Sequence, residues 1–270
     1  MFLASLVGNL LLVLLLSIAV AKIDRLYRKH RRRRLFWYTP AKVPIVPLAD
    51  VDPKFAAGPF GTRRESEVLL IGGSAVSGTT TYEAWILAVL AQGARRMFEF
   101  GTCTGRTAYA WARNSTPDAR ITTLTLSPDE RDTYQATDQD APADTQIALS
   151  ESCFLDFYYS GTEAEPKIEQ LFGDSKQLDE TPYLGQFDVI FIDGAHAYSY
   201  VASDTAKALR MIRPGGLILW HDYVGTWHLP GVFRFLNELA VKLPLRAIEG
   251  TSLAYYRAPQ AAAVELPRAA

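Results

Sequence analysis

The chain has 270 residues, of which 49% are hydrophobic and 21% are charged, and its formal net charge is −1. This balance is typical of a folded protein with one large core and excludes a chain that is disordered throughout. Only two cysteines are present, Cys103 and Cys153, so a disulfide-rich scaffold is excluded as well.

The amino-terminal segment is free of charge. No charged residue occurs in residues 1–21, and residues 10–21 are almost wholly apolar. Such a segment is about long enough to cross a bilayer as a helix. A cleaved signal peptide and a buried core helix are the alternatives. Ala19-Val20-Ala21 has the form of a cleavage site, but the usual positive start of a signal peptide is missing. We therefore expect residues 1–21 to form a transmembrane helix.

A basic flank and a linker are expected in residues 22–55. Residues 22–34 carry eight Lys/Arg against one Asp. Positive flanks stay in the cytoplasm and attract anionic headgroups, which explains this run better than nucleic-acid binding does. The prolines of residues 40–47 favour an extended spacer. The sequence thus predicts a single-pass membrane protein whose folded domain, residues 56–257, is cytoplasmic and does not bind nucleic acid.

The first strand of that domain leads into a glycine turn. Apolar residues at helical spacing predict a helix over 82–94, and a buried strand follows at 97–100. The turn Gly101-Thr102-Cys103-Thr104-Gly105 then precedes a helix from about Arg106. Small residues let the backbone approach a ligand, and the free N–H groups of a helix start attract anions. The pattern is typical of a nucleotide-like cofactor site, although such turns also occur without a ligand.

Polar residues end the apolar runs that follow. After a strand at 121–126, these runs close on Gly173-Asp174-Ser175, on Asp193-Gly194-Ala195-His196 and on His221-Asp222. Strands of a parallel sheet buried on both faces are continuously apolar, and ligands gather beyond their carboxyl ends. The polar strand ends are therefore the candidate site.

The remaining segments complete an alternating pattern. Residues 127–165 carry ten Asp/Glu against one Arg and exceed an ordinary connection, so we expect a helix and a surface insertion near the substrate mouth. Helices are predicted at 200–212 and 232–241. A terminal pair of strands is predicted at 245–250 and 252–257, and the tail 258–270 is expected to be disordered.

Two blocks carry a family resemblance. FDVIFIDGAHAYSYVASDTAKALRMIRPGGLILWHDY, residues 187–223, and FEFGTCTGRTA, residues 98–108, resemble class I S-adenosylmethionine (SAM)-dependent methyltransferases of the type called methyltransferase domain 24. The resemblance extends over about residues 81–257 and includes GTSLAYYR near the end. It implies SAM as cofactor and an α/β, Rossmann-like fold with a seven-stranded, mostly parallel sheet and helices on both faces.

The resemblance also implies cofactor-binding residues. Asp193 corresponds to the acidic residue near the reacting methyl group. Relatives usually carry an acidic residue for the ribose hydroxyls at the end of the second strand, where this chain has Thr125, which can bond a ribose only without charge assistance. The motif residues expected around methionine and ribose are Glu99, Gly101, Thr102 and Gly105, and those beside adenine are Gly173, Asp174 and Ser175.

The reaction predicts the chemistry of the strand ends. The protein must align the acceptor with the methyl group and deprotonate it if it is a hydroxyl. His196 suits a general base, although it is alternatively a loop histidine bonded to backbone. Asp193, His221 and Asp222 can converge on one divalent cation, as in metal-assisted methyltransferases. Because a histidine replaces an oxygen ligand, manganese or a metal-free mechanism are alternatives to magnesium.

Together these observations predict a membrane-anchored, SAM-dependent methyltransferase that methylates oxygen of a small or lipid-linked acceptor. Asp193, His196, His221 and Asp222 are its expected catalytic residues. The alternative is a catalytically degenerate methyltransferase-fold module that acts as a membrane-tethered binding domain. A nicotinamide dehydrogenase is disfavoured, because the glycine turn lacks the G-x-G-x-x-G pattern and no acidic residue ends the second strand.

Overall fold

The computed structural model describes residues 17, 20, 22, 41–56, 64–69, 78–225 and 230–260. The chain forms two compact units, Met1–Pro40 and Ala41–Ala270, and the fold described below is that of the second. Most of the predicted membrane segment and most of the predicted tail lie outside the described residues. Among the residues that are described, no helix is long and apolar enough to span a bilayer.

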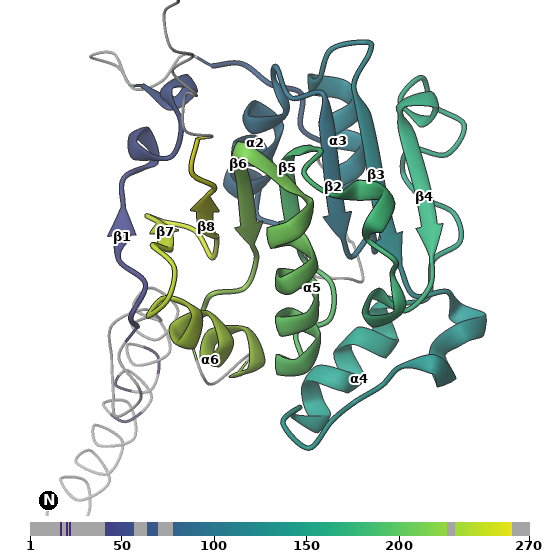
Figure 1. Ribbon diagram of the computed structural model, residues 1–270, viewed down its shortest axis with the longest axis vertical. Helices are drawn as coiled ribbons and strands as arrows, with labels where there is room; N and C mark the ends of the chain where they lie inside the picture. Colours follow the sequence, from purple (N-terminus) through teal and green to yellow (C-terminus); the bar gives the residue numbers. More distant parts are fainter. Residues whose placement is uncertain are drawn as a thin grey trace, which may run out of the picture. The chain divides into compact units, whose positions relative to one another are not determined.

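An eight-stranded sheet forms the centre of the domain, in the order β1-β7-β8-β6-β5-β2-β3-β4 (Figure 1). Strand β8 runs antiparallel to both of its neighbours, and the other pairs are parallel. The seven expected strands are present, and β1 is an eighth that was not predicted. The strands are β1 (Ile45–Val46), β2 (Arg96–Phe100), β3 (Arg120–Thr125), β4 (Ile168–Phe172), β5 (Phe187–Ile192), β6 (Ile212–Trp220), β7 (Arg246–Ile248) and β8 (Ala254–Arg257).

Five α-helices accompany the sheet in the described part of this domain. Three were predicted with bounds that differ by a few residues, α3 was predicted from its start at about Arg106, and α4 was expected without bounds within residues 127–165. They are α2 (Thr81–Ala91), α3 (Arg106–Asn114), α4 (Pro142–Glu151), α5 (Tyr198–Met211) and α6 (Pro230–Leu239). Short 3-10 helices lie at η1 (Leu48–Asp50), η2 (Pro53–Phe55), η3 (Pro128–Thr133), η4 (Glu165–Lys167), η5 (Ser175–Gln177) and η6 (Thr181–Tyr183).

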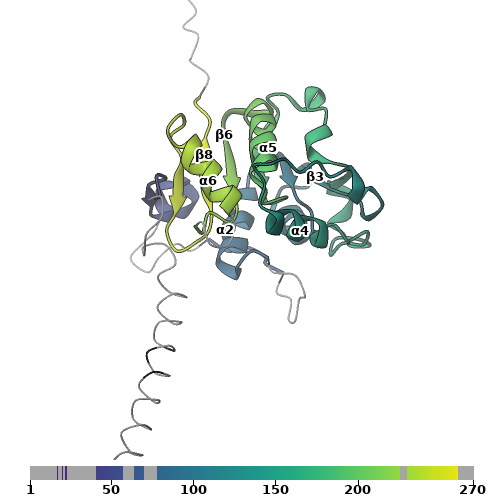
Figure 2. The ribbon, with the colours of Figure 1, turned by 90° about the horizontal axis from the view of Figure 1, so that it is seen from below.

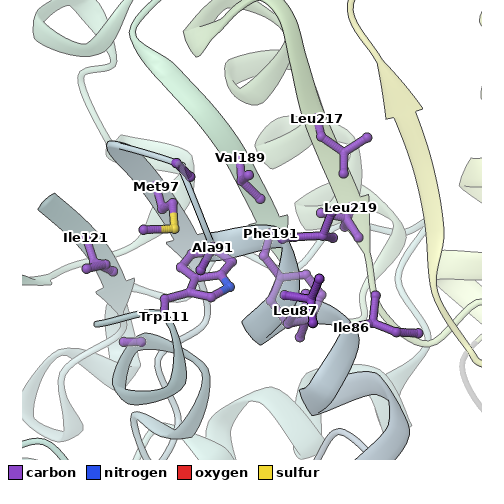
Figure 3. Packing of buried hydrophobic residues seen from close by; sticks show 14 of the residues in the cluster. Ile86, Leu87, Ala91, Met97, Trp111, Ile121, Val189, Phe191, Leu217 and Leu219 are labelled. Carbon is purple, nitrogen blue, oxygen red and sulfur yellow. The ribbon is translucent and has the colours of Figure 1, made fainter. Parts of the chain in front are cut away.

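Helices cover both faces of the sheet, and each face has its own apolar cluster. On one face, Leu87 of α2 and Trp111 of α3 pack with Phe191 of β5 (Figure 3). On the other face, Val201 of α5 and Leu236 of α6 belong to a second cluster with further residues of the same strands. Burial on both faces explains why the central strands read as continuous apolar runs.

The predicted linker is partly wrong, because its second half belongs to the domain. Strand β1 pairs with β7, and Val43, Val51 and Phe55 are each only 2% exposed. The domain therefore begins near Ala41, where the second compact unit starts, and not at residue 56. A two-residue strand among prolines has no periodicity that a sequence pattern could reveal.

The sheet reverses its direction of growth between β2 and β5. The chain adds β3 and β4 on one side of β2 and then returns to place β5 on its other side, where Phe100 pairs with Ile192. The arrowheads of β2 and β3 point toward the edge where α4 lies (Figure 1), and Figure 2 shows that edge from below. Open α/β sheets bind ligands at such a switch point.

Candidate functional site

A cavity lies at this switch point, bordered by the ends of β2, β3, β4 and β5 and by α4. Helix α4 belongs to the acidic stretch for which a helix near the substrate mouth was predicted. Most of the predicted cofactor residues line this cavity, namely Gly101, Thr125, Gly173, Asp174, Ser175 and Asp193. The remaining three, Glu99, Thr102 and Gly105, are not part of the cavity wall.

Gly101 has a structural role before any role toward a ligand. Its φ is +100°, and a Cβ atom there would lie 2.2 Å from the carbonyl oxygen of Asp193. The loops after β2 and β5 are tied at this point, because the Asp193 N–H donates to the Phe100 carbonyl over 2.8 Å. A side chain at residue 101 would therefore push apart the two loops that form the cavity.

Glu99 and Thr102 form a buried polar network behind the cavity wall. The Thr123 hydroxyl donates to Glu99 Oε2 over 2.7 Å and lies 2.8 Å from the Thr102 hydroxyl. Burial raises the pKa of Glu99 to about 8. These two residues support the glycine turn from behind, and direct contact with a cofactor stays a prediction for them.

Gly105 supports the same turn by packing. It precedes α3 with a φ of +77°, and a Cβ atom there would lie 2.6 Å from the Tyr159 ring. The left-handed conformation and the close ring both require glycine. Like Glu99 and Thr102, it shapes the turn from outside the cavity.

The far end of the cavity is built around Asp174. Its Oδ1 accepts from the Lys176 N–H over 2.9 Å, and its Oδ2 accepts from the Tyr200 hydroxyl over 3.1 Å. The Tyr200 ring stacks on Tyr134, with ring centroids 4.3 Å apart. Both tyrosines line the cavity, but neither was predicted as a site residue, because single aromatics in a helix and an insertion carry no motif.

All four predicted catalytic residues lie together at the ends of β5 and β6. His221 Nδ1 is 2.9 Å from Asp193 Oδ1 and 3.2 Å from Asp222 Oδ2. His196 Nε2 is 3.0 Å from Asp222 Oδ2. Asp222 has a φ of +61°, a left-handed conformation that few non-glycine residues adopt, although Asp adopts it more readily than most. Adjacent parallel strands explain why these side chains meet.

Glu83 is a member of this cluster that sequence reasoning missed. It lies in the first turn of α2, is 2% exposed, and places Oε2 3.6 Å from His221 Nε2. Its Oε1 accepts from the Ser252 N–H over 2.6 Å and from the Ser252 hydroxyl over 2.7 Å. In the sequence Glu83 reads only as the partner of Thr80 in a capping box, which it also is.

The carboxylates determine the protonation of the cluster. Burial alone would lower the pKa of His221, but Asp193, Asp222 and Glu83 outweigh burial and raise that pKa well above its usual value. Burial also opposes the charge of His196, but nearby acids, with Asp222 the nearest, outweigh burial and raise the pKa of His196. Although burial opposes it, bonding to the two histidines lowers the pKa of Asp222. The His221 ring is therefore held as an imidazolium among these carboxylates.

The arrangement also fits a divalent cation, with one change to the predicted set. Potential ligand atoms of Asp193, His196 and Asp222 lie within 4.8 Å of one another. His196 thus replaces His221, whose two nitrogens face carboxylates instead. The other ring nitrogen of His196 is buried without a partner among the described residues. Two oxygens and one imidazole suit manganese or zinc better than magnesium.

Comparison with known proteins gives a match to one family model, that of a methyltransferase domain, over residues 98–223. This range spans the glycine turn, the cavity wall and the polar ends of β5 and β6. No curated protein matches the chain.

Solved structures with a similar fold include three proteins. Cofactor-bound Rv0187 from MTB is 21% identical with a TM-score of 0.49, over 68% of this chain and 83% of that chain. The O-methyltransferase TomG from Streptomyces achromogenes, solved with SAM, is 21% identical with a TM-score of 0.47, over 68% and 82%. The O-methyltransferase from Bacillus cereus, solved with S-adenosylhomocysteine (SAH), is 20% identical with a TM-score of 0.46, over 67% and 82%.

Proposed function

We propose that this chain is a class I SAM-dependent methyltransferase and that it transfers the methyl group of SAM to an oxygen atom of a small acceptor. The observation that carries the proposal is the bond of His196 Nε2 to Asp222 Oδ2, 3.0 Å long, at the strand ends next to the glycine turn. It supplies a base oriented by a carboxylate where the acceptor has to meet the methyl group.

An oxygen acceptor makes use of such a base. The cofactor supplies an activated methyl group, so the protein has to bind, orient and deprotonate the acceptor. A hydroxyl is a weak nucleophile until its proton leaves, whereas a neutral amine already has a free electron pair. Asp222 orients the imidazole of His196 and stabilises the imidazolium that forms when it takes the proton. His221 holds Asp193 and Asp222 beside it.

A bound cation is the alternative way to the same product. When bound, it would lower the pKa of the acceptor hydroxyl and orient its oxygen. Asp193, His196 and Asp222 are the residues that would hold it. His196 could not then serve as the free base, so the two mechanisms exclude each other.

Binding and turnover with labelled SAM test the proposal. Calorimetry should detect binding of SAM, and incubation with hydroxylated small molecules should give a methyl ether. His196→Ala should lose turnover while SAM affinity changes little, because His196 lies toward the acceptor. A chelator that stops the wild type supports the cation mechanism, and one without effect supports His196 as base. Absence of SAM binding, or a product methylated on nitrogen or carbon, would contradict the proposal.

A non-catalytic binding module is the second candidate, favoured by Thr125 at the end of β3. A threonine binds ribose hydroxyls more weakly than a carboxylate does. SAM binding without any methylated product from cell extracts would support this candidate over an enzyme with turnover.

We further propose that residues 1–21 anchor the protein in a membrane, with the domain on the cytoplasmic side and a lipid-linked compound among its possible acceptors. The support is in the sequence: the segment is uncharged, and the basic run 22–34 follows it. The full chain should pellet with membranes and resist extraction by high salt. Release of the protein from the membrane by salt alone would indicate electrostatic binding at the membrane surface and would contradict a membrane-spanning segment.

A further inference from the structure

A second buried carboxylate borders the cofactor cavity, away from the reaction end. Asp204, on α5, is 1% exposed and is part of the cavity wall. Its Oδ1 has no hydrogen-bond partner among the described residues. A buried carboxylate oxygen without a partner is costly, so a buried acid in the wall of a cavity points to a donor on the ligand.

The neighbouring groups do not supply that donor. Lys207, the nearest cation on α5, donates its Nζ to the carbonyls of Lys176 over 3.2 Å and of Leu178 over 2.8 Å. Ser175 bonds the Asp204 carboxylate, yet Oδ1 remains unpartnered. Burial raises the pKa of Asp204 to about 7, in agreement with a poorly compensated acid.

Asp174 is already engaged by protein donors at this end of the cavity. The family resemblance places it beside adenine, but both of its oxygens already accept, one from the Lys176 N–H and one from the Tyr200 hydroxyl. Of the two carboxylates at this end, Asp204 is the one with an oxygen that has no partner among the described residues.

We propose that Asp204 Oδ1 accepts a hydrogen bond from the 6-amino group of the cofactor's adenine. The inference rests on the proposed binding of SAM and adds the residue that recognises the base. Asp204 and the stacked pair of Tyr134 and Tyr200 border one cavity. The tyrosines offer an apolar contact for the face of the base, and Asp204 offers an acceptor for its polar edge. Adenine recognition would then come from α5 in addition to the loop after β4.

Two ligands that differ only at the base edge test this. SAH and its analogue with hydrogen in place of the 6-amino group are titrated into the wild-type chain by calorimetry at pH 8.5, where Asp204 is ionised. The wild type should prefer SAH about 10- to 100-fold, which is the range of one hydrogen bond to a charged group. Asp204→Ala should bind both ligands within about threefold of each other.

The controls separate recognition from folding. Asp204→Asn keeps shape and one weaker acceptor, so the preference for SAH should fall by about threefold to tenfold even if the alanine variant does not fold. Asp140→Asn removes another acid that contacts α5, at Ser199, and should keep the full preference. An undiminished preference in Asp204→Asn, or no preference in the wild type, overturns the inference. Failure of the wild type to bind SAH at all overturns the proposed function with it.

Discussion

His221 Nδ1 lies 2.9 Å from Asp193 Oδ1, and this contact joins the carboxyl ends of β5 and β6. The other nitrogen of the same ring faces Glu83 of α2, 3.6 Å away. One buried imidazole therefore connects both strand ends to a helix that precedes them in the chain. The positive ring keeps acidic groups together that would otherwise repel one another.

Removing Glu83 should weaken the fold. Glu83→Ala leaves the positive ring of His221 without the carboxylate 3.6 Å away and the Ser252 donors without their acceptor, which should cost about 3 to 5 kcal/mol of unfolding free energy. Urea unfolding measures the effect, and Glu130→Ala, at an exposed position, is the control. A loss below about 1 kcal/mol would mean that Glu83 is not part of the buried cluster.

Glu83 should also contribute to acid sensitivity. Although burial opposes it, the nearby charge of His221 and the hydrogen bonds from Ser252 hold the pKa of Glu83 well below its ordinary value of 4.5. Its contribution is therefore present above about pH 4.5 and is lost as the pH falls, because the unfolded chain takes up the proton first. Unfolding curves at pH 6 and pH 4 should show a smaller loss of stability for Glu83→Gln than for the wild type.

Substitution of Gly101 should affect folding as well as cofactor binding. Gly101→Ala puts a Cβ atom 2.2 Å from the Asp193 carbonyl oxygen, so we expect several kcal/mol of destabilisation or no folded protein. Gly194→Ala is the control, because its Cβ would meet only ordinary contacts, the nearest at 3.5 Å. A melting temperature unchanged in Gly101→Ala would show that the loops after β2 and β5 yield easily.

Glu99 should make the protein less stable as the pH rises. Burial raises its pKa from 4.5 to about 8, so the folded state keeps a proton that the unfolded chain has lost over this range. Stability should fall between these two pH values and then level off. Glu99→Gln should remove about 2 to 4 kcal/mol of that fall, measured by urea unfolding at pH 5.5 and pH 8.5. Parallel curves for the two proteins would show that Glu99 is ionised in the fold.

Thr125 should limit the affinity for SAM. Thr125→Asp places a charge-assisted acceptor at the end of β3, and SAM should bind several-fold more tightly if this residue faces the ribose. Thr125→Val has a similar shape without the hydroxyl and should bind a few-fold more weakly. Calorimetry compares the three proteins, and equal affinities would place the ribose elsewhere in the cavity.

Truncation should locate the start of the domain. Deleting residues 1–40 should leave a domain as cooperative in unfolding as the full chain, because the second compact unit starts at Ala41. Deleting residues 1–55 removes β1 and the buried side chains of Val51 and Phe55, and should cost several kcal/mol. Equal stability of the two truncated proteins would show that residues 41–55 belong to the linker and not to the folded domain.

The sequence by itself determined the order of the elements and the edge of the sheet that carries the site. Apolar runs that end in polar residues, with a glycine turn after the first, are enough to predict a parallel sheet with its ligand at the carboxyl edge. The proximity of Asp193 to His221 and Asp222 follows from the same rule, because adjacent parallel strands end at the same edge.

Only the tertiary structure decided which side chains outside those strand ends join the site. In the sequence, Glu83 has the position of a helix-capping residue and Asp204 that of an ordinary residue on a helix face. Packing alone brings Glu83 to His221 and Asp204 to the cavity. The exchange of His221 for His196 among the possible metal ligands likewise depends on how each ring is turned. Contacts between elements distant in the chain depend on packing geometry, and a linear pattern does not contain that information.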